Sequence, residues 1–149
     1  MENAFAQPHE YWMRFAFHEA EKAFEADEVP IGCIIVKDNR IVGKGHNQTE
    51  QLLDPTAHAE MIAITAACTT VENKFLTGCT LYVTLEPCPM CAGAIVNSRV
   101  ERVVFGAYDP KAGACGTLFT ITEDDRLNHR TMTLGGVLDA ECGGILKDY

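Results

Sequence analysis

The sequence predicts an α/β fold of three layers, in which a mixed five-stranded sheet is flanked by helices on both faces. Apolar residues recur at helical spacing near the N-terminus, whereas short β-branched or alternating runs further along predict strands. A strand, a short helix and a second strand follow one another between residues 80 and 107, which is typical of a parallel βαβ unit. Because the 149 residues contain no visible repeat or linker, we expect one domain over residues 1–149.

The first third of the chain predicts a helix followed by a hairpin. Pro8 is a good first helical residue, and the helix should stop before Val29-Pro30. Residues 31–36 form a β-branched run, residues 38–40 a turn, and residues 41–43 begin the returning strand. The helix carries an apolar stripe that we expect to pack into the core: Trp12, Phe15, Ala16, Ala20, Ala23 and Phe24.

The rest of the chain predicts helices and strands in alternation. Asp54-Pro55-Thr56 is a start signal for a helix from about Ala57 to Thr69. Residues 80–85 predict a strand, residues 88–98 a helix and residues 102–107 a second buried strand. Gly113 and Gly116 mark a loop. Two last elements are expected in the C-terminal region, a strand near 131–134 and a helix over 137–146.

The composition is that of an ordinary globular protein, with 47% hydrophobic and 22% charged residues. No apolar run approaches the roughly 20 residues of a membrane span, so we expect no span and a cytoplasmic location. The net charge of −9 disfavours unspecific binding of nucleic acid. Residues 31–122 nevertheless hold eight acids against seven bases, so the central region is nearly neutral and leaves specific RNA binding open.

Two short motifs carry the chemistry of the chain: His58-Ala59-Glu60 and Pro87-Cys88-Pro89-Met90-Cys91. They supply one imidazole, two thiols at positions i and i+3, and a carboxyl group two residues from the imidazole. Three protein ligands with a fourth position open for water are typical of a catalytic zinc. A nearby carboxylate that is not a ligand suits a proton shuttle for that water. We therefore predict a zinc site of His58, Cys88 and Cys91, with Glu60 as the catalytic acid and base.

The predicted elements allow these groups to meet. His58 and Glu60 would diverge along a regular helix, but both fall in the first turn of the helix after Pro55. Prolines are tolerated only in a first helical turn, so Pro87 and Pro89 place the two thiols at the start of the next helix. Helix N-termini favour negative charge and therefore thiolates. Two such N-termini at the carboxyl ends of strands form the crevice expected of an α/β sheet.

Other interpretations of the same residues stay open. A lone C-x-x-C motif in an α/β protein is also compatible with a thioredoxin-type redox pair. A zinc-stabilised binding protein without catalysis is a third class, although it would have no use for a carboxylate at the open position. The remaining cysteines lack ligand spacing and are expected to be small core residues: Cys33, Cys68, Cys79, Cys115 and Cys142.

Several longer motifs resemble the cytidine deaminase superfamily and, within it, the bacterial tRNA-specific adenosine deaminases. The resemblance extends from about His9 to Leu146. Beyond the zinc motifs, it rests on residues 28–32 (EVPIG), 54–60 (DPTAHAE), 84–94 (TLEPCPMCAGA), 105–111 (FGAYDPK) and 128–130 (NHR). The zinc motif indicates only the superfamily, whereas the flanking motifs favour the tRNA branch. The resemblance implies a cytidine deaminase-like fold.

The resemblance also implies an activity and a set of contacts. It implies one Zn²⁺ per subunit and hydrolysis of adenosine to inosine at the wobble position of a tRNA anticodon loop. Asn47 would hydrogen-bond the flipped base, while Asp109 and Asn128 would line the pocket mouth. A homodimer is implied as well. The nearest alternative is a deaminase of a free base or nucleoside, such as guanine or cytosine, which would use the same zinc chemistry.

Overall fold

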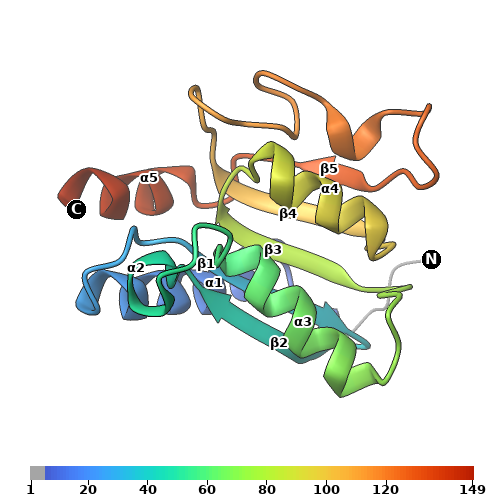
Figure 1. The fold of residues 1–149 in the computed structure, drawn as a ribbon, viewed down its shortest axis with the longest axis horizontal. Coiled ribbons are helices and arrows are strands. Elements are labelled where there is room, and N and C mark those ends of the chain that lie inside the picture. Colours follow the sequence, from blue (N-terminus) through green and yellow to red (C-terminus); the bar gives the residue numbers. More distant parts are fainter. Residues whose placement is uncertain (1–5) are drawn as a thin grey trace.

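The computed structural model describes residues 6–149 (Figure 1). Its helices and strands, in chain order, are α1 (His9–Glu25), β1 (Gly32–Lys37), β2 (Arg40–His46), α2 (Thr49–Leu52), α3 (Ala59–Val71), β3 (Thr80–Leu85), α4 (Pro89–Asn97), β4 (Arg102–Ala107), β5 (Met132–Leu134) and α5 (Asp139–Asp148). A 3₁₀ turn, η1 (Ile121–Glu123), lies between β4 and β5. Apart from α2 and η1, the order of elements is the one that the sequence predicts.

The sheet is mixed, with the strand order β2-β1-β3-β4-β5. Strand β1 pairs antiparallel with both β2 and β3, whereas β3–β4 and β4–β5 are parallel. The antiparallel β1–β2 pair is the predicted hairpin, and β3-α4-β4 is the predicted βαβ unit. These pairings confirm the five-stranded mixed sheet.

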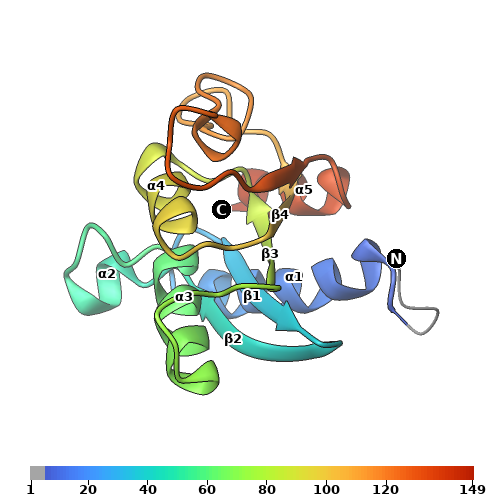
Figure 2. The same cartoon turned by 90° about the vertical axis from the view of Figure 1, so that its right-hand side faces the viewer.

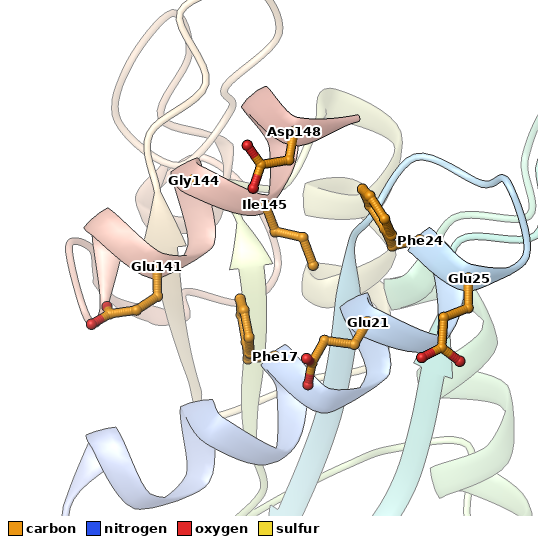
Figure 3. Close-up of a pocket in the computed structure, with 8 residues that line it drawn as sticks. All are labelled: Phe17, Glu21, Phe24, Glu25, Glu141, Gly144, Ile145 and Asp148. Atoms are coloured by element: carbon orange, nitrogen blue, oxygen red, sulfur yellow. The ribbon is translucent and has the colours of Figure 1, made fainter.

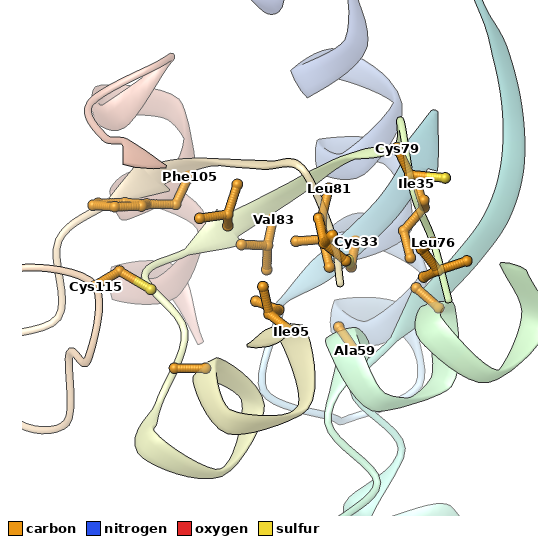
Figure 4. Close-up of a cluster of buried hydrophobic side chains, with 14 of the residues drawn as sticks. Cys33, Ile35, Ala59, Leu76, Cys79, Leu81, Val83, Ile95, Phe105 and Cys115 are labelled. Atoms are coloured by element: carbon orange, nitrogen blue, oxygen red, sulfur yellow. The ribbon is translucent and has the colours of Figure 1, made fainter. Parts of the chain in front are cut away.

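Helices cover both faces of this sheet, and two hydrophobic cores result. Helices α3 and α4 lie on one face, while α1 and α5 lie on the other (Figures 1 and 2). Side chains of a strand alternate between faces, so Cys33 and Ile35 of β1 join the α3–α4 core (Figure 4). Ile34 and Val36 join the α1 side instead. The three predicted layers are therefore present.

The buried stripe of α1 differs in part from the predicted one. Trp12, Ala16, Ala20 and Ala23 are buried as expected, but Phe15 and Phe24 are 39% and 38% exposed. Met13 and Glu19 are buried in addition. Helical periodicity leaves the border of a buried face uncertain by about one position, and the packing of α1 on β1 and β3 decides it.

The helices differ from the sequence prediction as well, by one or two residues at several ends and by one additional helix. Helix α3 begins at Ala59 instead of about Ala57, and the short helix α2 is not predicted at all. Helix α2 spans four residues, which is too short for a periodic pattern. It is held by a tertiary contact, since the buried carboxylate of Glu28 accepts hydrogen bonds from the backbone N–H groups of Glu50 (3.0 Å) and Gln51 (2.7 Å).

Helix α3 lies unusually close to the hairpin because β2 presents glycines to it. A Cβ atom on Gly43 would stand 2.6 Å from the carbonyl oxygen of Ala63 and 2.9 Å from the Cβ of Ala67. These are backbone and short side-chain atoms that have no freedom to move aside. The absence of a side chain at Gly43 therefore allows the middle of α3 to lie this close to the sheet.

Replacing Gly43 with Ala is expected to destabilise the fold by about 2 kcal/mol, because overpacking a tight contact forces the backbone apart. Urea unfolding at constant pH measures this free energy. Gly144→Ala is the matched control, since no atom lies within 4 Å of its Cβ position in α5. The control should change stability by less than about 1 kcal/mol and in the stabilising direction. Equal stability of both variants would contradict the close approach.

A groove of about 440 Å³ lies between α1 and α5 (Figure 3). Phe17, Phe24 and Ile145 line it, and acidic side chains surround them. It holds none of the predicted site residues and lies on the α1–α5 side of the sheet, away from α3 and α4. Within residues 6–149, no helix has the length and apolarity needed to cross a membrane.

Candidate active site

The candidate site lies at the sheet edge where β3 and β4 end. Parallel strands have their carboxyl ends together, and β2 ends at the same edge because Gly32 at the start of β1 pairs with His46. Helices α3 and α4 both begin here. His58 and Cys88 occupy the N-cap positions of these helices, with extended backbone, and Pro89 is the first helical residue of α4. The predicted convergence of two helix N-termini is thus present.

His58, Cys88 and Cys91 form a compact cluster whose ligand atoms all lie within 4.8 Å of one another. Nδ1 of His58 is 3.6 Å from Sγ of Cys88 and 3.6 Å from Sγ of Cys91. A tetrahedral zinc with Zn–N and Zn–S bonds of about 2.05 and 2.3 Å requires an N–S separation of about 3.6 Å. The donor types and their spacing therefore fit zinc. Three ligands leave the fourth tetrahedral position open.

The protonation of the cluster also suits a cation. A hydrogen bond from the Cys91 thiol, together with one from His58, lowers the pKa of Cys88 to about 4. The pKa of Cys91 is raised, because its thiol donates to Cys88 and is buried beside the Cys88 and Glu60 charges. The lowered pKa favours the thiolate form of Cys88, and a cation would displace the proton of Cys91, since metal-binding thiols are deprotonated.

Glu60 is buried next to the cluster, with 4% of its surface exposed. Burial raises its pKa to about 7. A carboxyl group with a pKa near neutrality exchanges protons readily in both directions, which is what a general acid and base requires. The first-turn position that the sequence predicts is observed, since Ala59 and Glu60 are the first two residues of α3.

Asn47 and Asp109 lie at the same sheet edge as the cluster. Asn47 is buried immediately after β2, and the N–H of the next residue, Gln48, donates to the carbonyl of Ala57 beside His58. Asp109 follows β4, and its side chain accepts hydrogen bonds from the N–H groups of Lys111 and Ala112. This carboxylate therefore shapes its own turn.

Asn128 lies elsewhere in the chain. It is exposed, and its carbonyl oxygen accepts a hydrogen bond from Arg99, which follows the C-terminal end of α4. The cluster lies at the N-terminal end of that helix, and nine helical residues span about 13 Å. The structure does not bring Asn128 together with the other predicted site residues.

The other histidine and cysteine side chains do not join the cluster in the part of the chain that the structure describes. His46 lies 3.7 Å from the carboxylate of Glu19 instead. Of the five cysteines expected in the core, four are buried and Cys68 is half-buried. Glu28 and Glu86 are two buried acidic residues near the site that were not predicted from the sequence as functional: Glu28 binds α2, and Glu86 binds the loop after β4. The sequence signal that could have identified them is the position of an acidic residue within an otherwise apolar or Pro-rich motif.

Fold and site together define a zinc-dependent deaminase of the hydrolase class. The zinc-binding region of cytidine and deoxycytidylate deaminases matches residues 6–107, which include His58, Glu60, Cys88 and Cys91. The chain belongs to the cytidine and deoxycytidylate deaminase family.

Within this family, the chain is similar to tRNA-specific adenosine deaminases. It is 51% identical to that of Bacillus subtilis over 140 residues, covering 94% of this chain and 87% of the relative. It is 54% identical to that of Aquifex aeolicus over 121 residues, covering 81% and 80%.

Two solved structures are also similar to this chain in fold and sequence. One from a study of A-to-I editing by tRNA:A34 deaminases superposes with a TM-score of 0.87 at 41% identity, covering 91% of this chain and 98% of that one. Guanine deaminase from Bacillus subtilis superposes with a TM-score of 0.67 at 38% identity, covering 74% of this chain and 71% of that one.

Proposed function

We propose that this protein converts adenosine to inosine at the wobble position of a tRNA anticodon loop, releasing ammonia. The observation that carries the proposal is the 51% identity to a tRNA-specific adenosine deaminase over 94% of the chain. The cluster of His58, Cys88 and Cys91 beside the buried Glu60 supplies the chemistry that this reaction needs.

His58, Cys88 and Cys91 would hold zinc, one ion per subunit. When bound, zinc lowers the pKa of water from 15.7 toward about 7 and thereby supplies the nucleophile. Glu60 takes a proton from the water that attacks C6 of adenine and passes it to the adjacent ring nitrogen, N1. Glu60 then takes the second proton of that water, from the hydroxyl now on C6, and gives it to the exocyclic amino group. The C6–N bond breaks, ammonia leaves, and the oxygen on C6 becomes the carbonyl of inosine. The overall change is adenosine plus water to inosine plus ammonia, so Glu60 ends in its original state.

The remaining site residues would bind the nucleotide. A base must leave the stack before it reaches a buried carboxyl group, and anticodon loops make this inexpensive. Asn47, buried at the site edge, would hydrogen-bond the flipped base. Asp109 would contact the nucleotide at the pocket mouth. Asn128 would contact neighbouring nucleotides. Because it lies far from the cluster of its own chain, it would serve the site of the partner subunit in a homodimer.

The cellular setting follows from the same proposal. We place the protein in the cytoplasm, where tRNA substrates are found and thiols stay reduced. Residues 1–149 would act as a single zinc-dependent deaminase domain, in a homodimer whose partner subunit extends the RNA-binding surface.

A second candidate is the deamination of free guanine. The similarity to guanine deaminase at 38% identity favours it, as does the net charge of −9, which repels a polyanion. The tRNA proposal is preferred because its relatives match more of the chain at higher identity.

The deciding experiment uses zinc-loaded protein and an anticodon stem-loop with adenosine at the wobble position. Nuclease digestion and chromatography measure inosine, while free guanine, cytosine, adenosine and cytidine are assayed in parallel for ammonia. We expect inosine in the stem-loop and no ammonia from the free compounds. Ammonia from guanine with an unchanged stem-loop would replace the tRNA proposal with the second candidate.

A further inference from the structure

Glu86 is an acidic side chain buried between β3 and the first thiol ligand, with 1% of its surface exposed. Burying a carboxylate is unfavourable unless it is paired or fully hydrogen-bonded. Among the ion pairs of the described residues, none involves Glu86. The compensation must therefore come from hydrogen bonds, and their donors identify what Glu86 holds.

All four donors to the Glu86 carboxylate come from one segment, residues 109–117. Oε1 accepts from the N–H of Asp109 (3.0 Å) and the hydroxyl of Thr117 (2.5 Å). Oε2 accepts from the N–H groups of Cys115 (3.1 Å) and Thr117 (3.0 Å). A carboxylate has acceptors only, so it matches this set of four donors.

Two further observations show how closely the same segment lies against Glu86 and Pro87. The N–H of Ala114 donates to the carbonyl of Pro87 at 2.9 Å. A Cβ atom on Gly113 would stand 2.5 Å from the Glu86 carboxyl carbon, so the glycine is what lets the segment approach. Residues 109–117 are thus fastened to the two residues that directly precede Cys88.

We propose that Glu86 is a positioning residue for substrate binding: it holds residues 109–117 as a wall of the pocket and thereby sets Asp109 relative to the metal ligands. The identity of the bound nucleotide rests on the proposed function above. The nine-residue segment has no helix or strand to stiffen it. Ala114 and Cys115 pack into the α3–α4 core, and the hydrogen bonds to Glu86 and Pro87 tie the segment to the ligand-bearing turn itself.

Glu86→Gln tests the proposal with a minimal change of shape. An amide has one acceptor oxygen, so its NH₂ group must face either the N–H of Asp109 or those of Cys115 and Thr117. In both orientations at least one backbone donor faces another donor. The segment should therefore detach while the ligand cluster stays intact.

We expect Glu86→Gln to raise KM for the stem-loop between about tenfold and a hundredfold, because small displacements of a positioning wall weaken binding strongly. The kcat per bound zinc should change less than about threefold. Hydrogen exchange should show lost protection in residues 109–117 and retained protection in α3 and α4. Tyr82→Phe is the control, because it removes one partly buried hydrogen bond, to His9, on the opposite face of the sheet. It should leave KM unchanged.

A second variant covers the case in which Glu86→Gln does not fold. Thr117→Val removes one donor from an exposed residue, so we expect a smaller rise in KM in the same direction. In an Asp109→Ala background, the effect of either variant on KM should shrink to less than about threefold, since the residue being positioned is gone.

Three results overturn the proposal: unchanged protection of residues 109–117 in Glu86→Gln, equal losses of kcat and zinc with KM unchanged, or full additivity with Asp109→Ala. Hydrogen exchange does not depend on the substrate. If the wild-type protein forms no inosine, the proposed function fails, and the exchange result still decides whether Glu86 holds the segment.

Discussion

Glu60→Gln is expected to lower kcat by at least about a thousandfold while zinc stays bound, because proton transfer by a positioned carboxylate contributes up to about ten thousandfold. The amide is almost isosteric and still occupies the buried place beside the cluster. It neither accepts the proton of the attacking water nor returns one to the leaving amino group. Inosine formation under single-turnover conditions and zinc content by elemental analysis measure the two outcomes.

Glu19→Gln is the matched control for this substitution. Glu19 is also a buried acidic residue, 5% exposed, but it lies on α1 and pairs with Lys22 at 2.7 Å. The control should keep its turnover within about threefold of wild type. High residual turnover in Glu60→Gln would remove Glu60 from the mechanism, whereas equal loss in both variants would indicate a general effect of buried charge.

Glu60 is also expected to make the free energy of unfolding depend on pH. Burial raises the pKa of Glu60 from 4.5 to about 7, so the unfolded chain loses this proton at lower pH than the native state does. Ionisation of Glu60 therefore favours the unfolded state as the pH rises from 4.5 to about 7. In chelator-treated protein, the difference in unfolding free energy between Glu60→Gln and wild type should therefore shift by about 2 kcal/mol in favour of the variant from pH 5 to pH 8. Urea unfolding at both values checks the sign.

Replacing Cys88 or Cys91 with Ala is expected to release zinc and to abolish the stabilisation that zinc confers. A ligand present at about a thousand times its Kd stabilises the native state by about 4 kcal/mol. For a chain of this length, this corresponds to roughly 8–16 °C in Tm. Chelation should thus lower the Tm of the wild-type protein by this amount and leave the Tm of either variant unchanged.

Cys142→Ala provides the control, because it makes the same chemical change at a buried cysteine outside the cluster. It should keep its zinc and its response to chelator, even if packing is weakened. A Cys88 or Cys91 variant that still binds one zinc per chain would show that the ligand set is wrong. A reversible disulfide in metal-free wild type with no zinc affinity would favour the redox interpretation instead.

Local signals were sufficient for the metal ligands and for most of the fold. Prolines at 87 and 89 limit the thiols to a first helical turn, and the helix start after Pro55 does the same for His58 and Glu60. The alternation of the strand runs and their spacing predicted five strands and the parallel unit, because period and connection length are properties of neighbouring residues.

Local sequence signals did not predict contacts between residues that are far apart in the chain. Helix α2 exists because Glu28 accepts hydrogen bonds from a segment more than 20 residues away, and the 109–117 wall depends likewise on Glu86. The exposure of Phe15 and Phe24 and the position of Asn128 also follow from packing between distant elements. The sequence by itself determined which chemistry the protein carries, since each ligand is defined by its type and its local turn. Only the tertiary structure decided which loops enclose that chemistry, because buried carboxylates bind whichever backbone donors the fold brings to them.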